Sequence, residues 1–229
     1  IVSGTVLRKE KGNFYILVGK AEAILPDNEL LPQDNLKRGD ILKAYILEVK
    51  QTSKEPLIKL SRTHPNFVIE LFTLEVPEIQ DGILEIKSIA RDPGERTKIA
   101  VSSKNPSVDP VGACVGMKGT RVQAVVRELK GERIDIIPYS NDMSLFIAKA
   151  LTPATVLKVG INEKEKTAVV VVENDQLSLA IGKRGQNVRL ASRLTGWSID
   201  VLSESEYSQM KHKETEKSFK ETLQKQEND

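Results

Sequence analysis

The sequence predicts an α+β, multidomain protein in which a small β-barrel precedes two related α/β units. Three observations lead to this fold class. The first 62 residues consist of short strand-like segments separated by turns, and helical spacing begins abruptly at His64-Pro65. Two stretches of about 70 residues then repeat one pattern of strands, glycine loop and helix.

The N-terminal segment alternates strands with turn-forming residues. The turns Glu10-Lys11-Gly12 and Gly19-Lys20 have the chemistry of β-hairpins, and residues 26–40 are expected to form a loop. Five short strands in about sixty residues favour a small barrel of the OB-fold type. The expected strands are Val2–Lys9, Asn13–Val18, Ala21–Leu25, Ile41–Val49 and Pro56–Ser61.

The rest of the chain is expected to form two copies of one unit. In the first copy a helix begins at Pro65 and ends at Pro77, and in the second a helix covers Ser144–Ala150. The Gly-x-x-Gly loops of the two copies lie 66 residues apart. The expected domains are residues 1–62, 63–138 and 139–202, followed by a charged tail, 203–229. Further strands are expected at Gly82–Arg91, Arg96–Ser102, Arg133–Ile137, Thr155–Ile161, Lys166–Val172 and Ser198–Leu202, and further helices at Thr120–Leu129 and from the second glycine loop to Leu194.

Composition and charge exclude several classes of protein. No stretch approaches 18 consecutive apolar residues, and the N-terminus lacks the pattern of a signal peptide, so we expect a cytoplasmic protein without membrane contact. One cysteine and two distant histidines cannot form a zinc-finger ligand set, and no metal or other cofactor is expected. Two basic stretches, Pro110–Arg127 and Gln176–Gly196, contain no acidic residue, which suggests a polyanionic partner.

Each basic stretch contains one of the glycine loops, and these are the candidate RNA-binding sites. Glycine allows a phosphodiester chain to approach the backbone, and the following helix directs its N–H groups and positive dipole end to the same place. Apolar residues beside such a clamp offer a surface to unstacked bases, as in a K-homology (KH) module, which holds about four nucleotides. The candidate residues are Val115, Gly116, Met117, Lys118, Gly119 and Arg121 in the first copy, and Ile181, Gly182, Lys183, Arg184, Gly185, Gln186, Asn187 and Arg189 in the second.

Other residues are weaker candidates. Phe14 and Tyr15 are neighbours on a strand and therefore point to opposite faces, so one is expected to pack inward while the other can stack on a base. Cys114 is expected in the core, and Asp135 and Asp200 occupy equivalent repeat positions that favour a structural role. No catalytic arrangement of side chains is recognisable, so the protein is not expected to be an enzyme.

Several motifs resemble one family. The segments Glu75-Val76-Pro77-Glu78-Ile79, residues 109–116 and residues 179–191 (LAIGKRGQNVRLA) are similar to those of the bacterial NusA transcription factors, and the resemblance runs from about Val2 to Leu202. It implies an OB-fold of the ribosomal-protein S-one type followed by two type II KH (α/β sandwich) modules. It also implies binding to single-stranded nascent RNA and, in the full-length factor, to RNA polymerase, with antitermination proteins as further candidate partners. The implied activity is the modulation of transcription pausing, termination and antitermination.

The sequence is compatible with three functions. The leading hypothesis is a single-stranded RNA-binding unit of a transcription elongation factor. The alternative is a protein-interaction scaffold that binds RNA polymerase or ribosomal and antitermination proteins, and an RNA-processing enzyme is a third. The short connection Pro138–Asp142 favours a rigid pair of KH modules that bind one continuous strand. The tail is expected to be partly helical and dispensable for RNA affinity.

Overall fold

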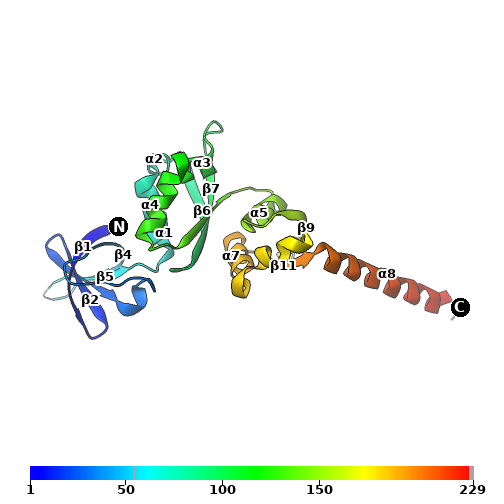
Figure 1. Cartoon of the computed structure of the whole chain (residues 1–229), viewed down its shortest axis with the longest axis horizontal. Helices are drawn as coiled ribbons and strands as arrows, with labels where there is room; N and C mark the ends of the chain where they lie inside the picture. Colours follow the sequence, from blue (N-terminus) through cyan, green and yellow to red (C-terminus); the bar gives the residue numbers. More distant parts are fainter. Residues whose placement is uncertain (54, 227–229) are drawn as a thin grey trace. The chain divides into compact units, whose positions relative to one another are not determined.

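The computed structural model describes residues 1–53 and 55–226, which divide into two compact units, Ile1–Tyr139 and Ser140–Asp229. The first unit holds a closed barrel and a three-stranded sheet with its helices, and the second holds another three-stranded sheet with its helices and a long C-terminal helix (Figure 1). The barrel and the first α/β module lie in the same compact unit. The expected domain boundaries at 62, 138 and 202 therefore stay a prediction.

The barrel closes in the strand order β1-β2-β3-β5-β4, with β3 and β5 parallel and the other neighbouring pairs antiparallel. Alternating side chains of these strands, including Val6, Ile16 and Leu25, fill its interior. The barrel closes through a short parallel pairing of β3 with β5, at Ala23–Ile58 and Ile24–Lys59. The strands are β1 (Val2–Glu10), β2 (Asn13–Val18), β3 (Ala21–Pro26), β4 (Ile41–Lys50) and β5 (Leu57–Ser61), so the five expected strands are confirmed to within one residue at each end. The expected loop also contains a short 3-10 turn, η1 (Asp27–Glu29).

The first α/β module packs its helices on one face of a three-stranded sheet (Figure 1). The sheet order is β6-β7-β8, in which β6 and β7 are antiparallel and β7 and β8 are parallel. The core between helices and sheet includes Phe67, Phe72, Ile99 and Leu129, all fully buried. The elements are α1 (Pro65–Glu75), α2 (Pro77–Gln80), β6 (Leu84–Asp92), β7 (Arg96–Ser103), α3 (Pro110–Val115), η2 (Met117–Gly119), α4 (Thr120–Glu128) and β8 (Arg133–Pro138).

The structure adds a short helix, α2, to the expected elements. From the sequence, Pro77 predicts only the end of the helix that begins at Pro65. Proline lacks an N–H and has a fixed φ, so it suits the first turn of a helix, where that N–H would have no partner in any case. Pro77 ends α1 and also begins α2, and Asp81 N–H donates to its carbonyl at 2.8 Å.

The second module repeats this topology. Its sheet has the order β11-β10-β9, with β9 and β10 antiparallel and β10 and β11 parallel, so the internal repeat is confirmed in three dimensions. Its elements are α5 (Met143–Ala150), β9 (Val156–Asn162), β10 (Thr167–Val172), η3 (Asn174–Gln176), α6 (Leu177–Ile181), η4 (Lys183–Gly185), α7 (Gln186–Thr195) and β11 (Ser198–Ser203).

The tail forms one helix, α8 (Glu204–Gln226), and residues 227–229 of the expected tail lie outside the described residues. Its first turn is fixed to the second module. Ser205 N–H donates to Asn174 Oδ1 at 3.2 Å, and the Glu206 carboxylate accepts from Ser203 N–H at 2.8 Å. Within the described ranges no helix is both long and apolar enough to cross a membrane.

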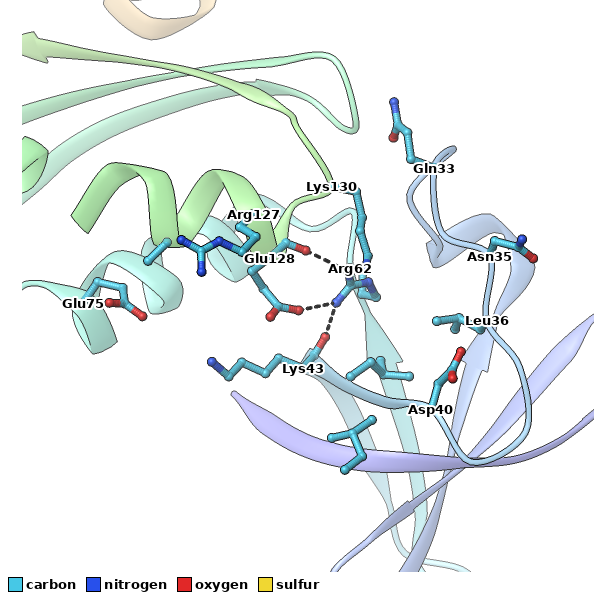
Figure 2. Close-up of a pocket in the computed structure, with 13 residues that line it drawn as sticks. Gln33, Asn35, Leu36, Asp40, Lys43, Arg62, Glu75, Arg127, Glu128 and Lys130 are labelled. Atoms are coloured by element: carbon cyan, nitrogen blue, oxygen red, sulfur yellow. Dashed lines mark hydrogen bonds and ion pairs between the residues drawn. The ribbon is translucent and has the colours of Figure 1, made fainter. Parts of the chain in front are cut away.

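A buried arginine joins the barrel to the first module. Arg62, which is 1% exposed, pairs with Asp34 at 2.7 Å. It also pairs with the Glu128 carboxylate at 3.0 Å and donates to the backbone carbonyls of Lys43 and Glu128 (Figure 2). Glu128 is the last residue of α4, so the barrel holds the C-terminal end of the helix that begins at the first glycine loop. A cavity of about 680 Å³ lies over this junction, with side chains of both charge signs in its walls.

Candidate nucleic-acid interface

The two glycine loops have the same backbone conformation. The first glycine has φ 76° and ψ 169° at Gly116 and φ 75° and ψ 172° at Gly182. The third residue is left-handed in both loops, with φ 53° at Lys118 and φ 54° at Arg184. In each loop the N–H of the second glycine donates to the carbonyl of the first, at 3.0 Å and 3.1 Å. The sequence repeat therefore extends to the detailed geometry of the candidate sites.

The first and second glycines of each loop are required for different physical reasons. Gly116 and Gly182 adopt φ and ψ values that are essentially restricted to glycine. A Cβ on Gly116 would lie 2.7 Å from Arg121 Cγ, and a Cβ on Gly182 would lie 2.8 Å from Asn187 Cβ. The second glycine, Gly119 or Gly185, needs only the left-handed region and has no close neighbour.

The helices that follow the loops begin without side-chain caps. The N-cap residues of α4 and α7 are Gly119 and Gly185, and neither helix end receives a side-chain hydrogen bond. The first N–H groups of a helix carry partial positive charge and have no acceptor within the helix. An anion such as an RNA phosphate can therefore accept from both helix ends.

Exposed cations lie in the same loops. Lys118, Lys183 and Arg184 are exposed, and within the described parts of the chain none of them has a carboxylate at ion-pair distance. Arg189, on the exposed side of α7, donates to the Arg184 carbonyl at 3.2 Å, which places its guanidinium beside the second loop. The first loop carries one cation between its glycines and the second carries two.

Two predicted contact residues instead fasten the loops to the modules. Arg121 Nη1 donates to the Ala113 carbonyl at 2.7 Å and pairs with Glu78 at 2.9 Å, so its charge is neutralised within the protein. Asn187 is fully buried, and its Nδ2 donates to the carbonyls of Ala180 and Leu151 at 2.9 and 3.0 Å. The Asn187 side chain is therefore not exposed for the direct RNA contact that was expected of it, whereas the contact expected of Arg121 stays a prediction.

Sequence reasoning missed Glu78 as a member of the first site. It precedes its partner Arg121 by 43 residues and comes from α2, a helix that was not expected. Because Glu78 lies far from the glycine motif in the sequence, the spacing of residues around that motif does not reveal it.

The remaining predicted residues surround the loops. Val115 is the last residue of α3 and Ile181 the last of α6, and both are half-buried directly before their glycine loops. Gln186 is the first residue of α7 and is also half-buried. Met117 is 82% exposed at the tip of the first loop. These positions place apolar and polar surface next to the cations, as a clamp with base-contacting walls requires.

The barrel separates its two adjacent aromatic residues as the strand alternation predicts. Phe14 belongs to the barrel core and is 7% exposed, so it is the inward-facing member of the pair. Tyr15 lies on the outer surface, and the Arg8 guanidinium carbon is 4.0 Å from the centroid of its ring. Arg8 also pairs with Glu22 at 2.7 Å, and these interactions with Glu22 and Glu10 raise the pKa of the arginine. Of these two neighbours, Tyr15 is therefore the candidate for base stacking.

Several titratable residues outside the loops are buried or paired within the protein. Burial raises the pKa of Cys114 to about 11, so its thiol is protonated at neutral pH. Asp135 pairs with Arg96 and with Lys98, each at 2.8 Å, and burial lowers the pKa of Lys98 to about 8. His64 caps α1, since its Nδ1 accepts from Asn66 N–H. The described residues contain no group of three His, Cys, Asp or Glu side chains arranged to hold a metal ion.

Comparison with protein families identifies both α/β modules. Residues 62–139 match the model of the NusA-like first KH domain, and residues 143–209 match that of the NusA-like second KH domain. Together the two matches cover more than half of the chain. They confirm the predicted fold class, in which an OB-like barrel precedes two KH domains.

Curated relatives extend the similarity over the barrel. The chain is 53% identical over 223 residues to the transcription termination/antitermination protein NusA of Halalkalibacterium halodurans, which covers 97% of this chain and 58% of that protein. It is 54% identical over 206 residues to the NusA of Bacillus subtilis, with 90% of this chain and 56% of that protein covered. The chain thus spans a little over half the length of these relatives. On the combined similarity of both KH domains and of the chain as a whole, this protein belongs to the NusA family.

Proposed function

We propose that this chain is the single-stranded RNA-binding unit of a NusA-type transcription elongation factor. Its contacts with nascent RNA modulate pausing, termination and antitermination. The activity is binding, and the site residues hold and position a strand rather than perform chemistry on it. In the full-length factor the further partners are RNA polymerase and antitermination proteins, and the factor acts in the cytoplasm.

One observation carries this proposal. Two loops with the same backbone conformation each present cations without carboxylate partners beside an uncapped helix N-terminus. A phosphodiester strand satisfies the helix N–H groups and the side-chain charges together. The apolar residues Val115 and Ile181 beside the loops support single-stranded RNA, whose unstacked bases can lie against them.

We further propose that each KH module, residues 63–138 and 139–202, contributes one clamp, and that the barrel, residues 1–62, adds a weaker stacking contact through Tyr15. Tyr15 is half-buried on the outer surface of strand β2, and the Arg8 guanidinium already lies over its ring. Base stacking on an aromatic ring contributes about 1–3 kcal/mol where it occurs.

Fluorescence anisotropy with a labelled single-stranded RNA of about twelve nucleotides tests the proposal. Two clamps of about four nucleotides each would occupy about eight, so this RNA is long enough for both. We expect saturable binding that weakens as salt concentration rises, and much weaker binding to a duplex of the same sequence. The scaffold alternative predicts the opposite result, in which immobilised RNA polymerase retains the chain while the RNA does not bind. That outcome would refute the RNA-binding assignment.

A further inference from the structure

The two glycine loops share a backbone conformation but differ in their side chains. Their backbones agree within a few degrees at the first glycine and at the left-handed third residue. The third residue is a cation in both, Lys118 or Arg184. The second residue is Met117 in the first loop and Lys183 in the second. Because the backbone is shared, any difference in how the loops bind RNA arises from the side chains.

Met117 is an exposed apolar side chain in the first loop. It is 82% exposed, the most exposed large apolar side chain among the described residues, whereas the apolar residues next to the loop are half-buried or buried. It does not lie in the left-handed region, so its identity is not dictated by the backbone. Packing and backbone strain therefore give no reason for methionine at the tip of this loop.

The charge of the first loop is also smaller than its sequence suggests. Arg121 lies within the same basic stretch, but its guanidinium pairs with Glu78 and donates to the Ala113 carbonyl. Lys118 is then the cation that the first loop offers to a phosphate, whereas the second loop offers both Lys183 and Arg184. The first clamp therefore offers fewer cations to a phosphate than the second, which also has the Arg189 guanidinium beside it.

We propose that the two clamps hold RNA by different chemistry, and that Met117 is a base-contacting residue of the first clamp. This inference rests on the proposed function. The second loop holds the strand through two phosphate contacts. The first loop holds it through one phosphate contact and through the Met117 thioether, which lies against the face of an unstacked base. Methionine is flexible and polarisable, and its sulfur makes favourable contacts with aromatic rings, so it accepts bases of different shape.

The two kinds of contact differ in their response to salt. Each phosphate contact to a single strand contributes about 0.7 to the slope of log affinity against log salt, because binding releases counterions. A thioether in contact with a base releases none. The contribution of Met117 to affinity should therefore be the same at low and high salt, whereas that of Lys183 should decrease as salt rises.

Three single substitutions test this assignment. Met117→Ala should weaken RNA binding about two- to tenfold, the range expected for a sulfur–aromatic contact, with no change in salt slope. Met117→Lys should add about 0.7 to the slope and bind more weakly than the wild type at high salt. Lys183→Met should reduce the slope by about 0.7. Unchanged affinity of Met117→Ala at every salt concentration would overturn the proposal.

Abasic scanning distinguishes a base contact from a contact with the sugar or phosphate. The probe is the same single-stranded RNA with one abasic nucleotide at each position in turn, measured with the wild type and with Met117→Ala. The loss of RNA affinity caused by Met117→Ala should disappear with one of the abasic RNAs and remain with the others. This is expected when the substitution and the missing base remove the same contact. A cost that persists at every position would also refute the base contact.

The experiment separates failure of this inference from failure of the proposed function. If wild-type protein does not bind the RNA, the proposed function fails. If the wild type and Lys183→Met behave as expected while Met117→Ala binds like the wild type, RNA binding stands and only the role of Met117 is wrong. All variants should keep the wild-type melting temperature, because residues 117 and 183 are exposed.

Discussion

Reversing the charge of the glycine loops should remove most of the RNA affinity without unfolding the modules. The variants are Met117→Asp with Lys118→Asp, and Lys183→Asp with Arg184→Asp. Both keep the two glycines, so the loop backbone is retained. Lys118 and Arg184 have left-handed φ values, and aspartate is among the residues that tolerate this region. The carboxylates would face the phosphate at a helix N-terminus that favours anions.

The size of the effect follows from the number of cations that each loop loses. A contact that contributes about 0.7 to the salt slope contributes about a fivefold factor to affinity at 0.1 M salt. Loss of Lys118 alone therefore predicts at least a fivefold decrease, and loss of both Lys183 and Arg184 predicts about 25-fold. The slope should decrease by about 0.7 in the first variant and about 1.4 in the second. Repulsion by the new carboxylates makes both affinity losses larger.

A matched control is available in the same module. Lys164 and Lys166 lie in the turn between β9 and β10, and Lys166 is also left-handed, with φ 50°. The Lys166 carbonyl accepts a hydrogen bond from Ser198 N–H, and Ser198 follows the C-terminal end of α7. The second glycine loop lies before the N-terminal end of the same helix. The ten residues of α7 separate the two ends by about 15 Å. Changing both lysines to Asp gives the same change in net charge away from the loop.

The assay is RNA anisotropy at four or more salt concentrations, with the melting temperature as the folding control. The control variant should lose much less affinity than the Lys183 and Arg184 variant. Equal losses would mean that net charge alone drives binding, and unchanged affinity in both loop variants would mean that the loops do not contact RNA. Either result would refute the reasoning from loop geometry.

Three further predictions concern single features of the structure. Because burial raises the pKa of Cys114 to about 11, the native protein should not react with an aromatic disulfide reagent at pH 8, and rapid labelling before unfolding would contradict this. Gly185→Ala should lower the free energy of urea unfolding by roughly 1–2 kcal/mol, the cost of a left-handed alanine. Gly182→Ala should lower it further, because its Cβ would also press against Asn187. Equal losses of stability in the two variants would be inconsistent with this packing. Truncation after Ser208 keeps the bonded first turn of α8 and should change RNA affinity less than twofold, and a tenfold loss would place RNA contacts in the tail.

Much of the fold could be predicted because local signals agreed with the tertiary structure. The barrel strands were bounded by hairpin turns and by Pro26, Pro32 and Gly39, and the internal repeat identified two equivalent modules before any contact was known. The expected end of α1 at Pro77 is confirmed, but the short helix α2 that begins there was missed. A proline both terminates a preceding helix and suits the first turn of a new one, and the sequence alone does not say whether the chain continues as helix or loop.

The candidate site was predictable as a pair of loops but not in the role of every side chain. Glycines and adjacent cations are local features, so Gly116–Gly119 and Gly182–Gly185 followed from spacing alone. Whether Phe14 or Tyr15 faces outward depends on which face of β2 lines the barrel, and this is decided by the closure of all five strands. A single strand contains no information about that choice.

The fifth residue after the start of each loop best shows where sequence reasoning reaches its limit. Arg121 and Asn187 occupy equivalent repeat positions next to cations, and both were expected to contact RNA. In the structure each lies against the first glycine of its loop and donates to a backbone carbonyl at the end of the preceding helix. An arginine and an asparagine thus perform one structural task with different donors. The arginine carries a charge that must be neutralised, and Glu78 of α2 neutralises it. The glycine-loop motif therefore does not reveal that Arg121 already has a carboxylate partner, because that partner comes from α2, outside the motif.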